Sequence, residues 1–196
     1  MFEKIKNMLK KEYPIAQVLS PNLQNKPIWS DWNTENAIKE GFKSSTWVYA
    51  CIWKRMKALS SIPWKVEVLK KDTWEEDPYH PLAMLLEKPN SVMSFQDLME
   101  RLIAHLDLGG NGIWYKIFAR KNGIEVPVEL WPLPPDGIKP VPSSENFISR
   151  YEYNYQNVRR NFEPKEILHI MYIDPSNVYW GMSPLMAGAK VVDTDV

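Results

Sequence analysis

The residue types most often used in catalysis and metal binding are few in this sequence and lie far apart. The histidines are His80, His105 and His169, and none has a second histidine three to five positions away, as an HExxH-type zinc helix would. His105 falls in a helical pattern and His169 in an apolar, strand-like run, so we interpret both as structural. A small hydrolase with a dispersed site around His105 or His169 and nearby carboxylates is the enzymatic alternative.

The sequence also gives little support for a catalytic nucleophile. Cys51 is the only cysteine, which excludes an intrachain disulfide and a zinc site built from several cysteines. It lies on the apolar face of a helical pattern, where we expect a small buried side chain and not a reactive thiol. No G-x-S-x-G motif occurs, Ser60 and Ser61 stand where a helix ends, and the carboxylates of residues 75–77 lie in a polar turn. We therefore predict no catalytic, cofactor-binding or metal-binding residue, no cofactor and no enzyme.

The motif Gly109-Gly110-Asn111-Gly112 invites a comparison with phosphate-binding loops. Such a loop follows a strand and opens a helix, because free amide groups at the helix N-terminus bind the anion. Here the glycines follow a helical pattern and open a strand-like one, and no Gly-Lys-Ser/Thr follows. We interpret the motif as a helix C-cap with a tight reversal, in which Gly109 or Gly110 has a positive φ and no ligand binds.

Three helical patterns come before the strands. The first is capped by Ser44 or Ser45 and ended by Pro63, and a short one covers residues 80–90. The third follows Ser94 and carries an apolar stripe up to the glycines. The apolar face expected for the first helix consists of Val48, Cys51, Ile52, Met56 and Leu59.

Strand signals dominate the second half of the chain. Asn122-Gly123 lies between two apolar runs and is the strongest hairpin signal, because both residues accept the positive φ of a type I′ turn. Alternating patterns predict further strands at 64–68, 137–142, 148–156 and 166–173, with a polar turn at 70–77. Helices followed by mostly antiparallel strands indicate an α+β fold, a mixed sheet with several flanking helices, preceded by an extended arm.

The length of 196 residues fits one compact domain with appendages. We expect a basic helix and extended arm at 1–34, an α+β domain at 35–182, and the truncated start of a further helical region at 183–196, where Ser183 and Pro184 form an N-cap pair. Lys plus Arg and Asp plus Glu both number 24, so tight nonspecific DNA binding is not expected. No long apolar segment is present, and we expect no membrane partner.

The order of several segments resembles the portal (head-tail connector) protein family of tailed bacteriophages, from about Thr46 to Lys190. Trp114 departs from the family pattern, which commonly has a small residue there, and the arm before Glu35 matches no pattern. The segments are STWVYACIWKRMKALSSIPWKV, HPLAMLLEKPNSVMSFQDLMERLIAHLDLGGNGIWYKI, VELWPLPPDGIKPV, EPKEILHIMYI and YWGMSPLMAGAK.

This resemblance implies a structural subunit of a homo-oligomeric ring, a dodecamer, at one vertex of the capsid. Double-stranded DNA would pass through its channel during packaging and ejection without sequence-specific binding. The partners implied are the large terminase subunit, the major capsid protein and neck adaptor proteins. The location implied is the virion, and the host cytoplasm during assembly. The chain would form most of the wing domain, with the helix from Ser183 leading toward the stem.

Ring assembly would also give exposed tryptophans a surface to pack against, since neighbouring subunits in a ring use two different patches. The candidates are Trp29, Trp32, Trp74 and Trp180, and the alternative for each is packing within its own subunit. An adaptor or peptide-binding module that uses strand edges and tryptophans is a further alternative.

Overall fold

The computed structural model describes residues 42–43, 45–121 and 123–186. The proposed basic helix and arm at 1–34, with Trp29 and Trp32, lie outside the described residues. The described part is α+β, as expected. Its helices are α4 (Thr46–Ser60), α5 (Pro81–Glu87) and α6 (Phe95–Gly109), with single 3-10 turns η2 (Pro135–Gly137) and η3 (Pro164–Glu166).

The strands form three sheets, and every described pairing is antiparallel. One sheet is the hairpin of β1 (Glu67–Lys70) and β2 (Thr73–Glu76). A second has the order β4-β3-β8, with β3 (Asn111–Lys121) paired to β4 (Ile124–Leu133) and to β8 (Ile167–Met171). The third has the order β5-β6-β7 and consists of Ile138–Ser143, Phe147–Tyr155 and Val158–Phe162.

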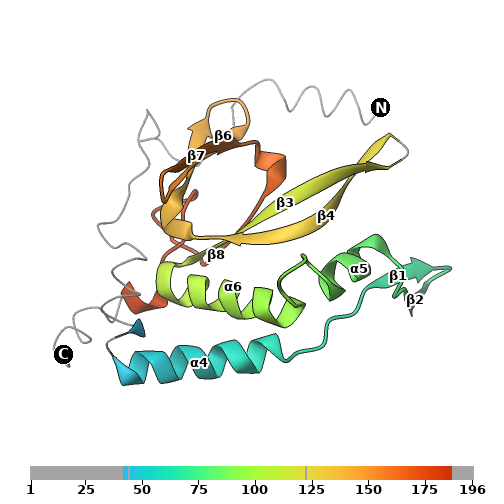
Figure 1. The fold of residues 1–196 in the computed structure, drawn as a ribbon, viewed down its shortest axis with the longest axis horizontal. Helices are drawn as coiled ribbons and strands as arrows, with labels where there is room; N and C mark the ends of the chain where they lie inside the picture. Colours follow the sequence, from blue (N-terminus) through green and yellow to red (C-terminus); the bar gives the residue numbers. More distant parts are fainter. Residues whose placement is uncertain (1–41, 44, 122, 187–196) are drawn as a thin grey trace.

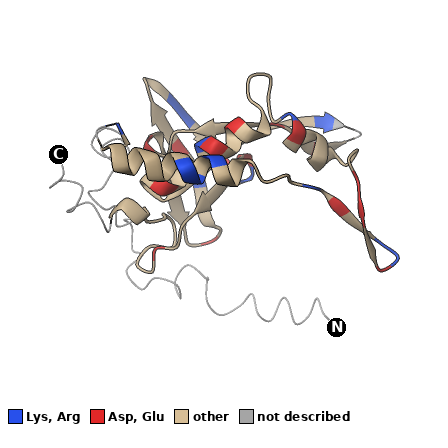
Figure 2. Cartoon of the chain, turned by 90° about the horizontal axis from the view of Figure 1, so that it is seen from below, with Lys and Arg blue, Asp and Glu red and all other residues tan. Residues whose placement is uncertain are grey.

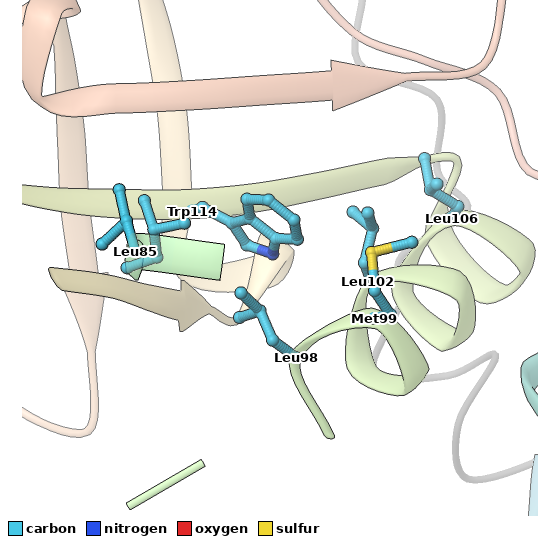
Figure 3. Close-up of a cluster of buried hydrophobic side chains, with 7 residues drawn as sticks. Leu85, Leu98, Met99, Leu102, Leu106 and Trp114 are labelled. Carbon is cyan, nitrogen blue, oxygen red and sulfur yellow. The ribbon is translucent and has the colours of Figure 1, made fainter. Parts of the chain in front are cut away.

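These elements stack in layers, from α4 through α6 and the β4-β3-β8 sheet to the β5-β6-β7 sheet (Figure 1). Helix α6 is buried on two sides because it lies between α4 and a sheet. One side packs on β3 and β4 (Figure 3), and the other packs on α4. The first cluster contains Leu85, Leu98, Met99, Leu102, Leu106, Trp114 and Leu130; the second contains Val48, Ile52, Met56, Ile103 and Leu108.

Strand β3 is covered on both faces, as the alternating directions of its side chains show. Trp114 points into the cluster with α6, whereas its neighbour Ile113 belongs to the cluster between the two larger sheets. Successive side chains of a strand point to opposite faces, so β3 joins the helical layers to the outer sheet. This central position requires its first residues, at the end of α6, to be placed accurately.

Two sequence-based expectations about the apolar face of α4 were wrong. Cys51 is exposed, because α4 is an outermost layer and α6 covers only the narrow stripe at positions 48, 52, 56 and 60. Leu59 is largely exposed for the same reason. The helix ends at Ser60, three residues before Pro63, as expected for a helix that a proline terminates.

The polar turn expected at 70–77 is largely a strand. Lys71 and Asp72 have φ values of 45° and 72°, and they form the reversal between β1 and β2. The preceding strand starts at Glu67 and excludes Trp64, which is exposed. Strand β7 was not foreseen, because its three central residues are polar and only Phe162 is buried.

Candidate functional site

The glycine motif at the end of α6 forms a buried joint with a distant segment, residues 179–184. We call residues 107–112 together with 179–184 the glycine junction. Helix α6 begins with a capping box, in which Ser94 and Asp97 exchange hydrogen bonds between side chain and backbone. It ends at Gly110, whose φ of 74° is left-handed and whose amide donates to the Leu106 carbonyl over 2.8 Å. The expected C-cap is therefore confirmed.

Glycine is required at Gly110 by space as well as by conformation. A Cβ atom at this position would collide with the Met182 carbonyl carbon and would lie 2.7 Å from the Ser183 nitrogen. A Cβ at Gly181 would in turn collide with the Gly110 carbonyl oxygen. That oxygen also accepts a hydrogen bond from the Tyr172 amide at 2.9 Å. The two backbone segments thus touch directly, and no side chain fits between them.

Asn111 fastens the two segments with a complete set of hydrogen bonds. Its side chain is fully buried. Nδ2 donates to the carbonyl oxygens of Gly109, at 2.7 Å, and Gly181, at 3.0 Å. Oδ1 accepts from the Gly181 amide at 2.7 Å and lies 3.0 Å from Nε2 of His169. The amide group is thus saturated by the protein's own atoms, which leaves it no role in binding a ligand.

His169 is a packing and hydrogen-bonding residue at this joint. Its ring lies 5.3 Å from that of Trp180 and 6.0 Å from that of Tyr151. Burial lowers its pKa to about 4, so the imidazole is neutral at pH 7 and its Nε2–H donates to Asn111. The hydrogen-bond partner is an amide and not the carboxylate that a hydrolytic dyad would use.

The other two histidines are also explained by the fold. His105 lies on α6, where burial, and to a lesser degree the charge of Arg101, lower its pKa to about 4. A base this weak is poorly matched to general-base catalysis near neutral pH. His80 is the N-cap of α5, and its Nδ1 accepts a hydrogen bond from the Leu82 amide at 3.2 Å. These contacts give the hydrolase alternative no support.

A second polar cluster adjoins the junction, and sequence reasoning missed it. Asp107 is buried and accepts a hydrogen bond from the Tyr172 hydroxyl at 2.9 Å, and its Oδ2 lies 3.1 Å from Arg55 Nε. Burial raises the pKa of Asp107, although Tyr172 and Arg55 both oppose this change. Ser183 completes the link, since its hydroxyl donates to the Asp107 carbonyl oxygen at 2.7 Å and accepts from the Leu185 amide at 3.0 Å. The signal for it in the sequence was a single carboxylate, Asp107, between two leucines near the end of α6.

This arrangement fastens residues 179–184 to the end of α6. Ser183 caps the turn that starts at Pro184, as expected, and it is anchored to α6 through Asp107. The Gly110 amide donates to the Leu106 carbonyl, the Gly110 carbonyl accepts from the Tyr172 amide, and the Gly109 carbonyl accepts from the Asn111 side chain. Within the described ranges no group of three or more His, Cys, Asp or Glu residues is placed to hold a metal ion. The site therefore holds two segments of the chain together.

The remaining candidates lie on the surface. Glu75 and Glu76 form exposed ion pairs with Lys70, at 3.2 Å, and Lys65, at 2.7 Å. They are solvated charges, as expected. Trp180 packs against the cluster between the larger sheets, within its own subunit, whereas Trp74 is 66% exposed. Among the described residues, no helix has the length and apolar character needed to span a membrane.

Comparison with known proteins identifies a matching family and a sequence relative. The family described as "Phage portal protein" matches residues 46–196. An uncharacterised protein of Rickettsia bellii is 26% identical over 160 residues, which cover 79% of this chain and 40% of that protein. The chain thus spans less than half the length of this relative.

Solved structures with a similar fold come from gene transfer agent particles. A chain in the virion of the native particle aligns with a TM-score of 0.72 at 23% identity, covering 91% of this chain and 46% of that one. A chain in the neck of the empty particle, computed with C6 symmetry, aligns with a TM-score of 0.74 at 23% identity, over 92% of this chain and 47% of that one. A chain in the neck of the native particle, computed with C12 symmetry, aligns with a TM-score of 0.72 at 23% identity. The alignment covers 90% of this chain and 45% of that one.

Proposed function

This chain belongs to the phage portal protein family, and we propose that it forms part of a homo-oligomeric, dodecameric ring at one vertex of a phage capsid. The family is structural and non-enzymatic, so the chain is a structural protein and not an enzyme. The observation that carries the proposal is the family match, which extends from the first residue of α4 to the end of the chain. The similar chains in neck structures with C12 and C6 symmetry support a ring.

We further propose that double-stranded DNA passes through the ring during packaging and ejection. Each phosphate that a protein neutralises strengthens DNA binding through released counterions, so a conduit benefits from a balanced charge. Acidic and basic residues are equal in number, and both signs are scattered over the described elements (Figure 2). In this proposal the protein interacts with the large terminase subunit, the major capsid protein and neck adaptors, first in the host cytoplasm and then in the virion.

The glycine junction supports this proposal, because it fastens the segment at Ser183 to the end of α6. The segment that leaves the domain at Ser183 is held by backbone contacts at Gly110 and by the saturated side chain of Asn111. We propose that the junction sets the direction in which the chain continues toward the stem of the ring.

The test is the assembly state of the protein expressed at its natural length. Sedimentation velocity and negative-stain electron microscopy should show closed rings with a central hole. A protein that stays monomeric at every concentration and salt condition would contradict the proposal. Dye-labelled double-stranded DNA should bind the rings only weakly at physiological salt, and tight binding there would contradict the conduit.

A further inference from the structure

The hairpin of β1 and β2 is an arm that lacks a hydrophobic core of its own. Its two strands pair only with each other, and it extends away from the layered body (Figures 1 and 2). Every residue of β2 is exposed, and in β1 only Val68 is partly covered. An isolated two-stranded hairpin is marginally stable in water, so a sequence that maintains one has a reason to do so.

One face of this arm combines apolar and acidic side chains. Leu69 pairs directly across the strands with Trp74, and Glu67 pairs with Glu76 on the same face. Carboxylates directly opposite each other destabilise a hairpin unless cations balance them. Lys65 contacts Glu76 at 2.7 Å and also interacts electrostatically with Glu67, so one cation balances two carboxylates. The face therefore offers an apolar pair beside an excess negative charge.

The outer surface of α4 carries the complementary features. Positions 47, 51, 54 and 58 follow helical spacing, and all four are exposed, opposite the buried stripe that contacts α6. Trp47 is 80% exposed and Cys51 is exposed beside it. Lys54 makes no ion pair with any residue that the structure describes. The stripe thus presents a large aromatic surface and, about two turns further along the helix, a positive charge.

We propose that the Leu69–Trp74 face of the arm docks on the outer stripe of α4 in the adjacent copy of this chain, with Glu67 facing Lys54. This inference rests on the proposed ring. The arm starts beyond the C-terminal end of α4, whereas Trp47 lies at the N-terminal end, so the arm and the Trp47 end of the stripe are at opposite ends of α4 (Figure 1). Subunits that use two different patches repeat around a closed ring. Aromatic side chains and an oppositely charged pair are typical of such contacts.

Crosslinking between two thiol variants tests the contact directly. In the full natural-length protein, the wild type carries its exposed thiol on α4, and a tagged Cys51→Ser/Thr73→Cys variant carries one at the tip of the arm. A short bis-maleimide reagent should join the two in a mixed ring, and the chain with Thr73→Cys alone should give a ladder of higher oligomers. Rings without mixed crosslinks, or crosslinks only between two arms, would overturn the docking and leave the ring intact.

Charge reversal provides an independent test with a matched control. Lys54→Glu places like charges together and should lower the ring-forming association constant about tenfold, and adding Glu67→Lys should restore it. Lys88→Glu makes the same charge change on an exposed residue at the end of α5, which belongs to neither the arm nor α4, and should have no effect. If Lys54→Glu assembles as well as Lys88→Glu, the docking is wrong although the portal assignment stands. A wild type that never assembles would overturn both.

Discussion

The glycine junction and the β1–β2 arm differ in how far their polar and apolar groups find partners within one chain. At the junction, two segments 70 positions apart meet without space for a Cβ atom, and Asn111 forms all its hydrogen bonds with protein groups. On the arm, Trp74 is 66% exposed and Glu67 faces another carboxylate. A saturated, buried site maintains the fold, whereas an exposed site with unbalanced charge and apolar surface is suited to a partner.

Helix α4 shows the same difference on its two sides. Its inner stripe, with Val48, Ile52 and Met56, packs on α6. Its outer stripe leaves Trp47 and Cys51 in solvent. Substitutions at the junction should therefore change the free energy of unfolding, and substitutions on the arm should change assembly instead.

The largest effect is expected for Gly110→Ala. A positive φ costs a non-glycine residue about 1–2 kcal/mol, and the collision with residues 182–183 adds a similar or larger amount, for a total of about 4 kcal/mol. Gly123→Ala is the matched control, because Gly123 has a φ of 80° and open space around its Cα. Urea unfolding should separate the two variants by at least about 2 kcal/mol. Equal losses of unfolding free energy in the two variants would show that the close approach to Met182 does not affect stability.

Asn111→Ala should be the next most destabilising change. It leaves the buried Gly181 amide and carbonyl without partners, at a cost of about 3 kcal/mol. Asn154→Ala changes the same side chain on the exposed side of β6 and should cost less than about 0.5 kcal/mol. Hydrogen exchange should locate the loss at residues 179–184. If the amides of this segment keep their protection, Asn111 does not hold it.

Acid should weaken the junction through His169. Its pKa is lowered to about 4 in the folded state, below the value of 6.5 expected when unfolded, so the unfolded state binds more protons between these values. The stabilisation is complete above about pH 6.5, and about 2 kcal/mol of it is lost on going from pH 7.5 to 5. His169→Gln keeps a donor toward Asn111 and should remove this share of the pH dependence, while the similar share expected from buried His105 remains. Identical profiles for the variant and the wild type would contradict the assignment.

The smallest effect on folding is expected for Trp74→Ser. An exposed side chain that packs on no core contributes little, so the free energy of unfolding of the monomer should change by less than about 0.5 kcal/mol. The same variant should lower ring formation in the natural-length protein, measured by sedimentation velocity. A large loss of monomer stability would show that the arm packs on its own subunit.

Much of the local structure could be predicted from the sequence. The Ser94 cap, the apolar stripe of α6 and the left-handed Gly110 follow from short-range rules, and the structure confirms each. The structure also confirms the hairpin of β3 and β4, with Gly123 at a φ of 80°. The division at 1–34, 35–182 and 183–196 stays a prediction. The partner of the glycine motif could not be foreseen, because nothing near Gly110 in sequence indicates contact with Gly181.

The sequence alone determined which residues cap, turn and alternate, since these depend on backbone conformation and on neighbours a few positions away. The tertiary structure decided which apolar residues are covered. Cys51 and Ile52 are adjacent and both apolar, yet only Ile52 faces α6. It also decided that the glycines meet a second backbone and not a phosphate. Burial and close contact depend on how layers stack, and this is set by segments far apart along the chain.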